Sequence, residues 1–330
     1  MECKRIFIIA PPFYSHFSPM MALAVCFRRA GASVVVGCSA SFSDSIKGAG
    51  LEFAELEITR NANTGVAEKT EQPAEEAERI RAFIEATKRG ALETLRFQNR
   101  NRQLDMLADP ERIREEINVF AGRFKPDFFV VDQLSYAVSL ALYCLQLPFI
   151  TFCPGHPTYI PQEDQLFGVP YAWPPEFDIA DMELAELRNE ASGVRDHFTA
   201  MFNAIIQEYD SRLPLIRDAF RFASESAQLF NYPDFGGLHK DRDGPKKIFL
   251  GYCFTEEGLN RSWQEMLAAA GERYPRVLVS FGTFLSARED VLRKTVAGIA
   301  NRFPQSLCIV SAGASAPALR DLENDGTIVR

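Results

Sequence analysis

The chain lacks the sequence features of several protein classes. No apolar stretch approaches the roughly 20 residues that a membrane-spanning helix needs. Its 7 cysteines are scattered without a CxxC pair, so we expect reduced thiols and neither a zinc site nor a disulfide framework. Lys and Arg (36) are outnumbered by Asp and Glu (44), and a net charge of −8 argues against binding nucleic acid through phosphate neutralisation. The start, Met-Glu-Cys-Lys-Arg-Ile, has no signal-peptide layout, so a cytoplasmic protein is expected.

Three motifs that would assign a chemistry directly are also missing. There is no Walker A sequence and no GxGxxG after any expected strand, so neither a P-loop nor a dinucleotide-binding turn is indicated. The GxSxG elbow of serine hydrolases is absent as well. The function must therefore be sought in less standard patterns.

What the chain does have is a regular alternation of short apolar runs and helical segments. The alternation predicts an α/β fold with parallel sheets, in two Rossmann-like domains, because parallel strands need helical crossovers. If the first sheet has the order 3-2-1-4-5, its first and fourth strands are neighbours. The expected strands are residues 6–10, 33–37, 51–56, 127–131, 149–153, 227–230 and 247–250, then 276–280, 307–311 and 327–329.

The helices and loops complete this prediction. Ser18 and Pro19 fit the start of the first helix, since Ser is a good N-cap and Pro suits the first helical position. Further helices are expected over 43–47, 71–106, 110–124, 135–145, 180–223 and 288–303, and a long loop rich in proline and aromatics over 154–180. We divide the chain into a first domain (1–254), a linker (255–275) and a C-terminal domain (276–330) that we expect to be incomplete.

Two residues at strand ends suggest acid–base chemistry. His16 follows the first strand and Asp132 ends the fourth, and these strands are neighbours in the order above. Ligands of open α/β sheets bind at the carboxyl ends of strands, where strand order reverses. A histidine backed by a carboxylate can serve as a general base. The alternative is structural: a helix start and a strand end.

Other segments give weaker indications. Residues 277–283, VLVSFGT, form a strand and a turn whose backbone N–H groups could bind a phosphate, although an ordinary strand–helix turn reads the same way. Asp241-Arg242-Asp243 has the DxD form of a metal–diphosphate site but lies in a turn-like DRDGP sequence. In the long loop, His156 could line a pocket, and Phe167, Tyr171 and Trp173 could form an apolar wall or simply pack.

Taken together, these segments resemble the nucleotide-sugar-dependent glycosyltransferases of the GT-B fold. PPFYSHFSP resembles the family's G-H-x-x-P region, KPDFFVVDQ its P-D-x-(V/I)-x-x-D strand, IFLGY its V-G-P position, and VLVSFGT its V-x-V-S-x-G-T segment. The matches occur in family order over nearly the whole chain. The form is especially similar to bacterial carotenoid and antibiotic or macrolide glycosyltransferases.

The resemblance implies an inverting transfer of a hexose from a UDP- or dTDP-sugar to a hydroxyl of a lipophilic natural product, without a metal ion or other cofactor. It implies that His16 is the base, that Asp132 orients it, and that Ser280, Gly282 and Thr283 contact the donor diphosphate. The acceptor would meet residues near the first helix and in the long loop, for which the candidates are Phe13, Tyr14, Gln133 and His156.

The sequence also departs from the family pattern. Ser15 stands where the family has glycine before the histidine. The family's W-x-P-Q-like turn, H-x-G-x-N/T-S helix start and D/E-Q pair are not found. Two alternatives to an active transferase therefore remain: an inactive homologue that assists another transferase, and a hydrolase or epimerase on the same scaffold.

Overall fold

A computed structural model of the chain describes residues 3–59, 73–101, 106–162, 164–235, 244–254, 261–324 and 326–330. These residues form two compact units, which we treat separately. Among the described residues, no helix combines the length and the apolar character that crossing a membrane would require.

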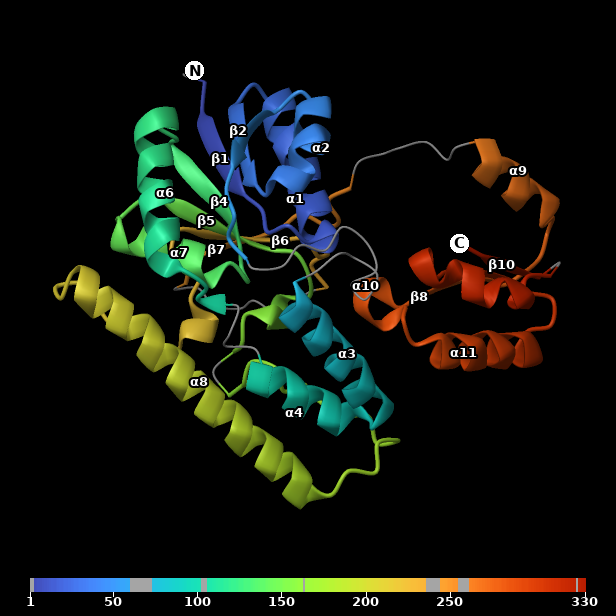
Figure 1. Cartoon of the computed structure of the whole chain (residues 1–330). Helices are drawn as coiled ribbons and strands as arrows, with labels where there is room; N and C mark the ends of the chain where they lie inside the picture. Colours follow the sequence, from blue (N-terminus) through green and yellow to red (C-terminus); the bar gives the residue numbers. More distant parts are fainter. Residues whose placement is uncertain are drawn as a thin grey trace. The chain divides into compact units, whose positions relative to one another are not determined.

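The first unit is built on a seven-stranded parallel sheet in the described part of the chain (Figure 1). The strand order is β3-β2-β1-β4-β5-β6-β7, which contains the order 3-2-1-4-5 considered above and adds two strands. The strands are β1 (Arg5–Ile9), β2 (Ser33–Cys38), β3 (Glu52–Glu55), β4 (Phe128–Asp132), β5 (Phe149–Cys153), β6 (Ala227–Phe230) and β7 (Lys246–Phe249).

Helices cover both faces of this sheet, as the alternating helices and strands require (Figure 1). One face packs against α1 and α2, and the other against α6, α7 and α8. Because both faces are covered, the strands are continuous apolar runs. The helices are α1 (Tyr14–Arg29), α2 (Ser43–Gly48), α4 (Ala91–Asn101), α6 (Pro110–Phe124), α7 (Tyr136–Cys144) and α8 (Asp181–Tyr209), with short 3-10 turns at Ala40–Phe42, Pro157–Tyr159 and Ala219–Arg221.

Two of the predicted helices have different limits in this unit. Helix α1 begins at Tyr14, four residues before Ser18, and Pro19 lies inside it. The carbonyl of Phe13 accepts hydrogen bonds from the N–H groups of His16 and Phe17, so the helix starts before the proline. Helix α8 ends at Tyr209 rather than continuing toward residue 223.

The second unit contains a three-stranded parallel sheet with the order β10-β9-β8 among its described residues. Its core joins the sheet to α11 and the following 3-10 helix, through Leu292, Val296, Val310 and Leu319. The elements are α9 (Arg261–Ala269), β8 (Arg276–Ser280), α10 (Gly282–Leu285), α11 (Glu289–Arg302), β9 (Leu307–Ser311), the 3-10 helix Gly313–Leu322 and β10 (Thr327–Val329).

Helix α3 (Ala74–Lys88) also groups with the second unit, although the sequence division places it in the first domain. The Arg288 guanidinium donates a hydrogen bond to Oγ1 of Thr87, near the end of this helix, at 3.0 Å. The helix predicted over 71–106 is thus divided into α3 and α4. The break lies at Gly90, whose φ of +114° is a backbone conformation that favours glycine.

Candidate active site

His16 lies in the first turn of α1, directly after the carboxyl end of β1. The backbone N–H of Ala10 donates to the carbonyl of Gly37, which extends the β1–β2 pairing toward this turn. Ser15 does not have a positive φ. The serine therefore occupies this position without the strain that a glycine-specific conformation would impose.

Asp132 ends β4, and β4 is the direct neighbour of β1 in the sheet. Ile9 of β1 is in register with Val131, so the residues that follow these two strands meet at the same sheet edge. Nδ1 of His16 lies 2.9 Å from Oδ2 of Asp132. The sheet order thus brings together two side chains 116 residues apart.

The carboxylate of Asp132 is held rigidly. Its side chain is fully buried, and Oδ1 accepts a hydrogen bond from the N–H of Leu134 at 2.9 Å. Oδ2 faces His16, so Nδ1 carries the proton that it donates to the carboxylate. In this tautomer Nε2 has a free lone pair, and the imidazole retains 19% of its side-chain exposure. Nε2 can therefore accept a proton from a molecule at the surface.

Two opposing effects set the pKa of His16. Burial lowers the pKa, because the charged imidazolium loses water. The charge of Asp132 and the hydrogen bond to it raise the pKa, and together they outweigh burial. The net result is a pKa above the ordinary value of 6.5. The imidazolium formed by taking up a proton is thus stabilised by the buried carboxylate, as general-base catalysis requires.

The four expected acceptor residues have different environments. Tyr14 and His156 are exposed, and Phe13 is half-buried with its ring centroid 5.9 Å from that of His16. His156 uses Nδ1 to cap the short 3-10 turn that follows it, accepting from the N–H of Thr158. Gln133 is only 1% exposed, and its amide nitrogen donates to other parts of the protein rather than to solvent.

The expected donor-binding segment forms the turn from β8 into α10. Ser280 ends the strand and is exposed, and Gly282 begins the helix with a φ of +67°. A side chain there would be strained, which accounts for glycine in the VSFGT sequence. The side chain of Thr283 lies outside the described residues.

The DxD sequence, Asp241-Arg242-Asp243, falls in a part of the chain that the structure does not describe. Among the residues that are described, no group of three or more His, Cys, Asp or Glu side chains has the arrangement of a metal site.

Sequence reasoning did not single out three residues around Asp132. Tyr136 is fully buried and receives a hydrogen bond from Gln133. Burial raises the pKa of the Cys153 thiol to about 12, and the charge of Asp132 contributes, so this thiol is neutral and unreactive beside the site. Gly155 has no room for a side chain, because a Cβ would overlap the ring of Tyr159. None of them belongs to a recognisable motif.

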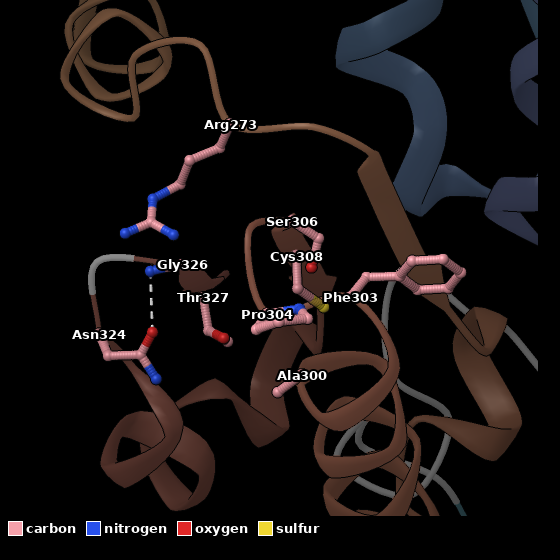
Figure 2. Close-up of a pocket in the computed structure, with 9 residues that line it drawn as sticks. All are labelled: Arg273, Ala300, Phe303, Pro304, Ser306, Cys308, Asn324, Gly326 and Thr327. Atoms are coloured by element: carbon pink, nitrogen blue, oxygen red, sulfur yellow. Dashed lines mark hydrogen bonds between the residues drawn. The ribbon is translucent and has the colours of Figure 1, made fainter.

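A cavity of about 420 Å³ lies in the second unit (Figure 2). It is lined by Arg273, by the end of α11 and by the first residues of β9 and β10, including Cys308 and Thr327. It therefore lies at the amino edge of the sheet, whereas Ser280 and Gly282 lie at the carboxyl edge. No residue of the expected donor segment lines this cavity.

The comparisons with known proteins give structural matches only. No protein-family model and no curated protein matches the chain. Among solved structures, the chain is similar to the glycotransferase of kitacinnamycin (TM-score 0.58, 16% identity, covering 100% of this chain and 71% of that one). It is also similar to CalG4, the calicheamicin glycosyltransferase (0.55, 14%, 100% and 71%).

A third match is the spinosyn rhamnosyltransferase SpnG complexed with thymidine diphosphate (TM-score 0.51, 16% identity, 98% and 70% coverage). At these identities the matches bear on the fold. They agree with the parallel sheets of the two units. The chain has the GT-B fold of the nucleotide-sugar glycosyltransferases.

Proposed function

We propose that the protein is an inverting glycosyltransferase that moves a hexose from a UDP- or dTDP-sugar to a hydroxyl of a lipophilic natural product. The observation that carries this proposal is the hydrogen bond between His16 and the buried Asp132 at the carboxyl edge of the first sheet. The fold supports it, and so does the thymidine diphosphate bound to one structural neighbour.

The chemistry follows from the geometry of this pair. The acceptor hydroxyl gives its proton to Nε2 of His16 while its oxygen attacks the anomeric carbon of the sugar. The bond from that carbon to the donor phosphate breaks on the opposite face, and its electron pair leaves with the diphosphate, so the configuration inverts. Asp132 stabilises the imidazolium formed and fixes the tautomer that presents Nε2.

The second unit would hold the donor. We propose that backbone N–H groups and hydroxyls of Ser280, Gly282 and Thr283 contact the diphosphate and stabilise its developing charge. In this scheme no metal ion is needed, so EDTA should leave transfer unchanged. A loss of transfer in EDTA that Mg²⁺ or Mn²⁺ restores would contradict this part of the proposal.

The acceptor would contact the first unit near α1 and the loop 154–180. Tyr14 and His156 are exposed, and so are Tyr159, Tyr171 and Phe177 of the loop. Exposed aromatic side chains suit a lipophilic acceptor, because its apolar surface can be buried against them. We propose that Phe13, Tyr14 and His156 contact it directly.

The test is a transfer assay with UDP-glucose and dTDP-glucose, a macrolide aglycone and a hydroxylated carotenoid, with products identified by mass spectrometry and the new anomeric centre by NMR. His16→Ala should reduce the rate by 10² to 10⁴ or more, on the order expected for a general base. His197→Ala is the matched control, since His197 is exposed on α8.

Equal turnover in His16→Ala and His197→Ala would contradict the general-base role. Retained configuration at the anomeric carbon of the product would contradict the inverting mechanism. If the unmodified protein transfers no sugar but co-purifies with a transferase whose activity it raises, including as His16→Ala, the auxiliary role is favoured instead.

A further inference from the structure

The turn that ends in Tyr136 is fixed to the carboxylate of Asp132. The N–H of Leu134 donates to Oδ1 of Asp132, and the N–H of Ser135 donates to its backbone carbonyl at 3.0 Å. Tyr136 then begins α7 and is fully buried. The positions of Asp132 and Tyr136 are thus coupled by a short hydrogen-bonded turn.

Gln133, in the same turn, connects it to the long loop. Its Nε2 donates to the hydroxyl of Tyr136 at 3.1 Å and to the backbone carbonyl of Tyr159 at 3.0 Å. Its own N–H donates to the carbonyl of Phe152 at 2.8 Å. The side chain is 1% exposed, so water cannot replace these bonds without opening the structure.

The ring of Tyr136 provides a second attachment for the loop. Phe167 lies edge-on to it, with ring centroids 6.4 Å apart, and stacks on Phe220 at 4.6 Å. The hydroxyl of Tyr136 also donates to the carbonyl of Phe220 at 3.3 Å. The loop is therefore fastened at Tyr159 and at Phe167, and both attachments involve the turn that follows Asp132.

We propose that Gln133 and Tyr136 are positioning residues that fasten the loop 154–180 to the strand end carrying Asp132. They hold the loop at Tyr159 and Phe167 in a fixed place relative to the turn that follows Asp132. The role of Gln133 is thereby to position the loop rather than to touch the acceptor. The consequence for acceptor binding rests on the proposed function, but the attachment of the loop does not.

The test measures the loop itself. Gln133→Met keeps the size of the side chain but removes both donated bonds, and Tyr136→Phe removes only the hydroxyl. Tyr143→Phe is the matched control, because Tyr143 lies on the same helix and its hydroxyl donates to the carbonyl of Pro214, outside the loop. Each variant is made in a Trp263→Phe background, which leaves Trp173 of the loop as the sole tryptophan.

We expect Gln133→Met and Tyr136→Phe to shift the Trp173 emission to longer wavelength. They should also speed chymotryptic cleavage within 154–180 by about tenfold, the effect of losing one or two buried hydrogen bonds. Tyr143→Phe should do neither. Unchanged emission and cleavage in folded Gln133→Met and Tyr136→Phe proteins would overturn the proposal, and so would equal changes in the control.

Transfer kinetics separate this inference from the proposed function. Where the unmodified protein transfers sugar, the two variants should raise the acceptor KM by about tenfold and leave the pH at which the rate rises unchanged, since His16 and Asp132 are intact. A loosened loop with an unchanged acceptor KM would overturn the positioning role. If the unmodified protein transfers nothing, the proposed function fails, and the fluorescence and cleavage measurements still decide whether the loop is fastened.

Discussion

At the scale of single residues, the His16–Asp132 pair makes its own electrostatic prediction. The carboxylate raises the pKa of His16 above 6.5 against the opposing effect of burial. Asp132→Asn removes the negative charge and leaves burial, so the pKa of His16 should fall below that of the unmodified protein. NMR titration of the four histidine rings measures this directly.

An unchanged His16 pKa in Asp132→Asn would mean that the two side chains are not paired in solution.

The same pKa has a consequence for stability. A folded-state pKa above the unfolded value of 6.5 means that protonated His16 favours the folded protein. This contribution is fully present below about pH 6.5 and is lost as the pH rises through the folded pKa. The free energy of unfolding should therefore decline over that pH range in the unmodified protein, and this decline should be smaller in Asp132→Asn. Urea titrations at pH 6 and at pH 8 measure the difference. An equal decline in both proteins would contradict it.

At the scale of elements, the glycines differ in how much room a side chain would have. A Cβ at Gly37 in β2 would lie 2.8 Å from the ring of Phe7, so Gly37→Ala should destabilise the first unit by about 1–3 kcal/mol through overpacking. Gly193 in α8 has no atom within 4 Å of such a Cβ. Gly193→Ala should therefore stabilise by about 0.5–1 kcal/mol, because alanine loses less backbone entropy in a helix.

Urea unfolding monitored by circular dichroism measures both changes. If Gly193→Ala destabilises the protein as much as Gly37→Ala does, the packing described around these two glycines is wrong.

Elements with a strong local signal could be predicted from the sequence. The strands 149–153, 227–230, 276–280, 307–311 and 327–329 have the predicted limits, because each is a short run of mainly apolar residues that stands out from its neighbours in the sequence. The predicted start of α1 was wrong because Ser18-Pro19 resembles a helix cap. In the structure the helix begins at Tyr14, and Phe17 in its first turn packs on Phe42, with ring centroids 4.3 Å apart.

The site was only partly predictable, because a local sequence pattern marks its strands but not its loop contacts. Strand order brings His16 to Asp132; the alternation of elements predicts a parallel sheet, and the two residues meet in it if the order is 3-2-1-4-5. The bonds from Gln133 to Tyr159 and Tyr136 depend on how a long loop folds back. No periodicity or motif marks such a loop contact.

At the scale of the whole molecule, the two units have separate cores. The hydrophobic clusters of the first unit and the cluster around Leu292, Val296 and Val310 share no residue. A cavity made in one core therefore removes contacts in that unit alone. Leu292→Ala, at a fully buried position of α11, should cost about 2–5 kcal/mol in the second unit.

Hydrogen exchange followed by mass spectrometry locates this loss. Faster exchange should be confined to β8, β9, β10 and α11. The amides of β1, which precedes His16, and of β4, which ends in Asp132, should keep their protection. Ile117→Ala, at a fully buried position of α6, is the reciprocal variant and should spare β8 to β10. Equal loss of protection in both units after either substitution would show that they unfold together. The acceptor and donor halves of the proposed reaction could not then be perturbed independently.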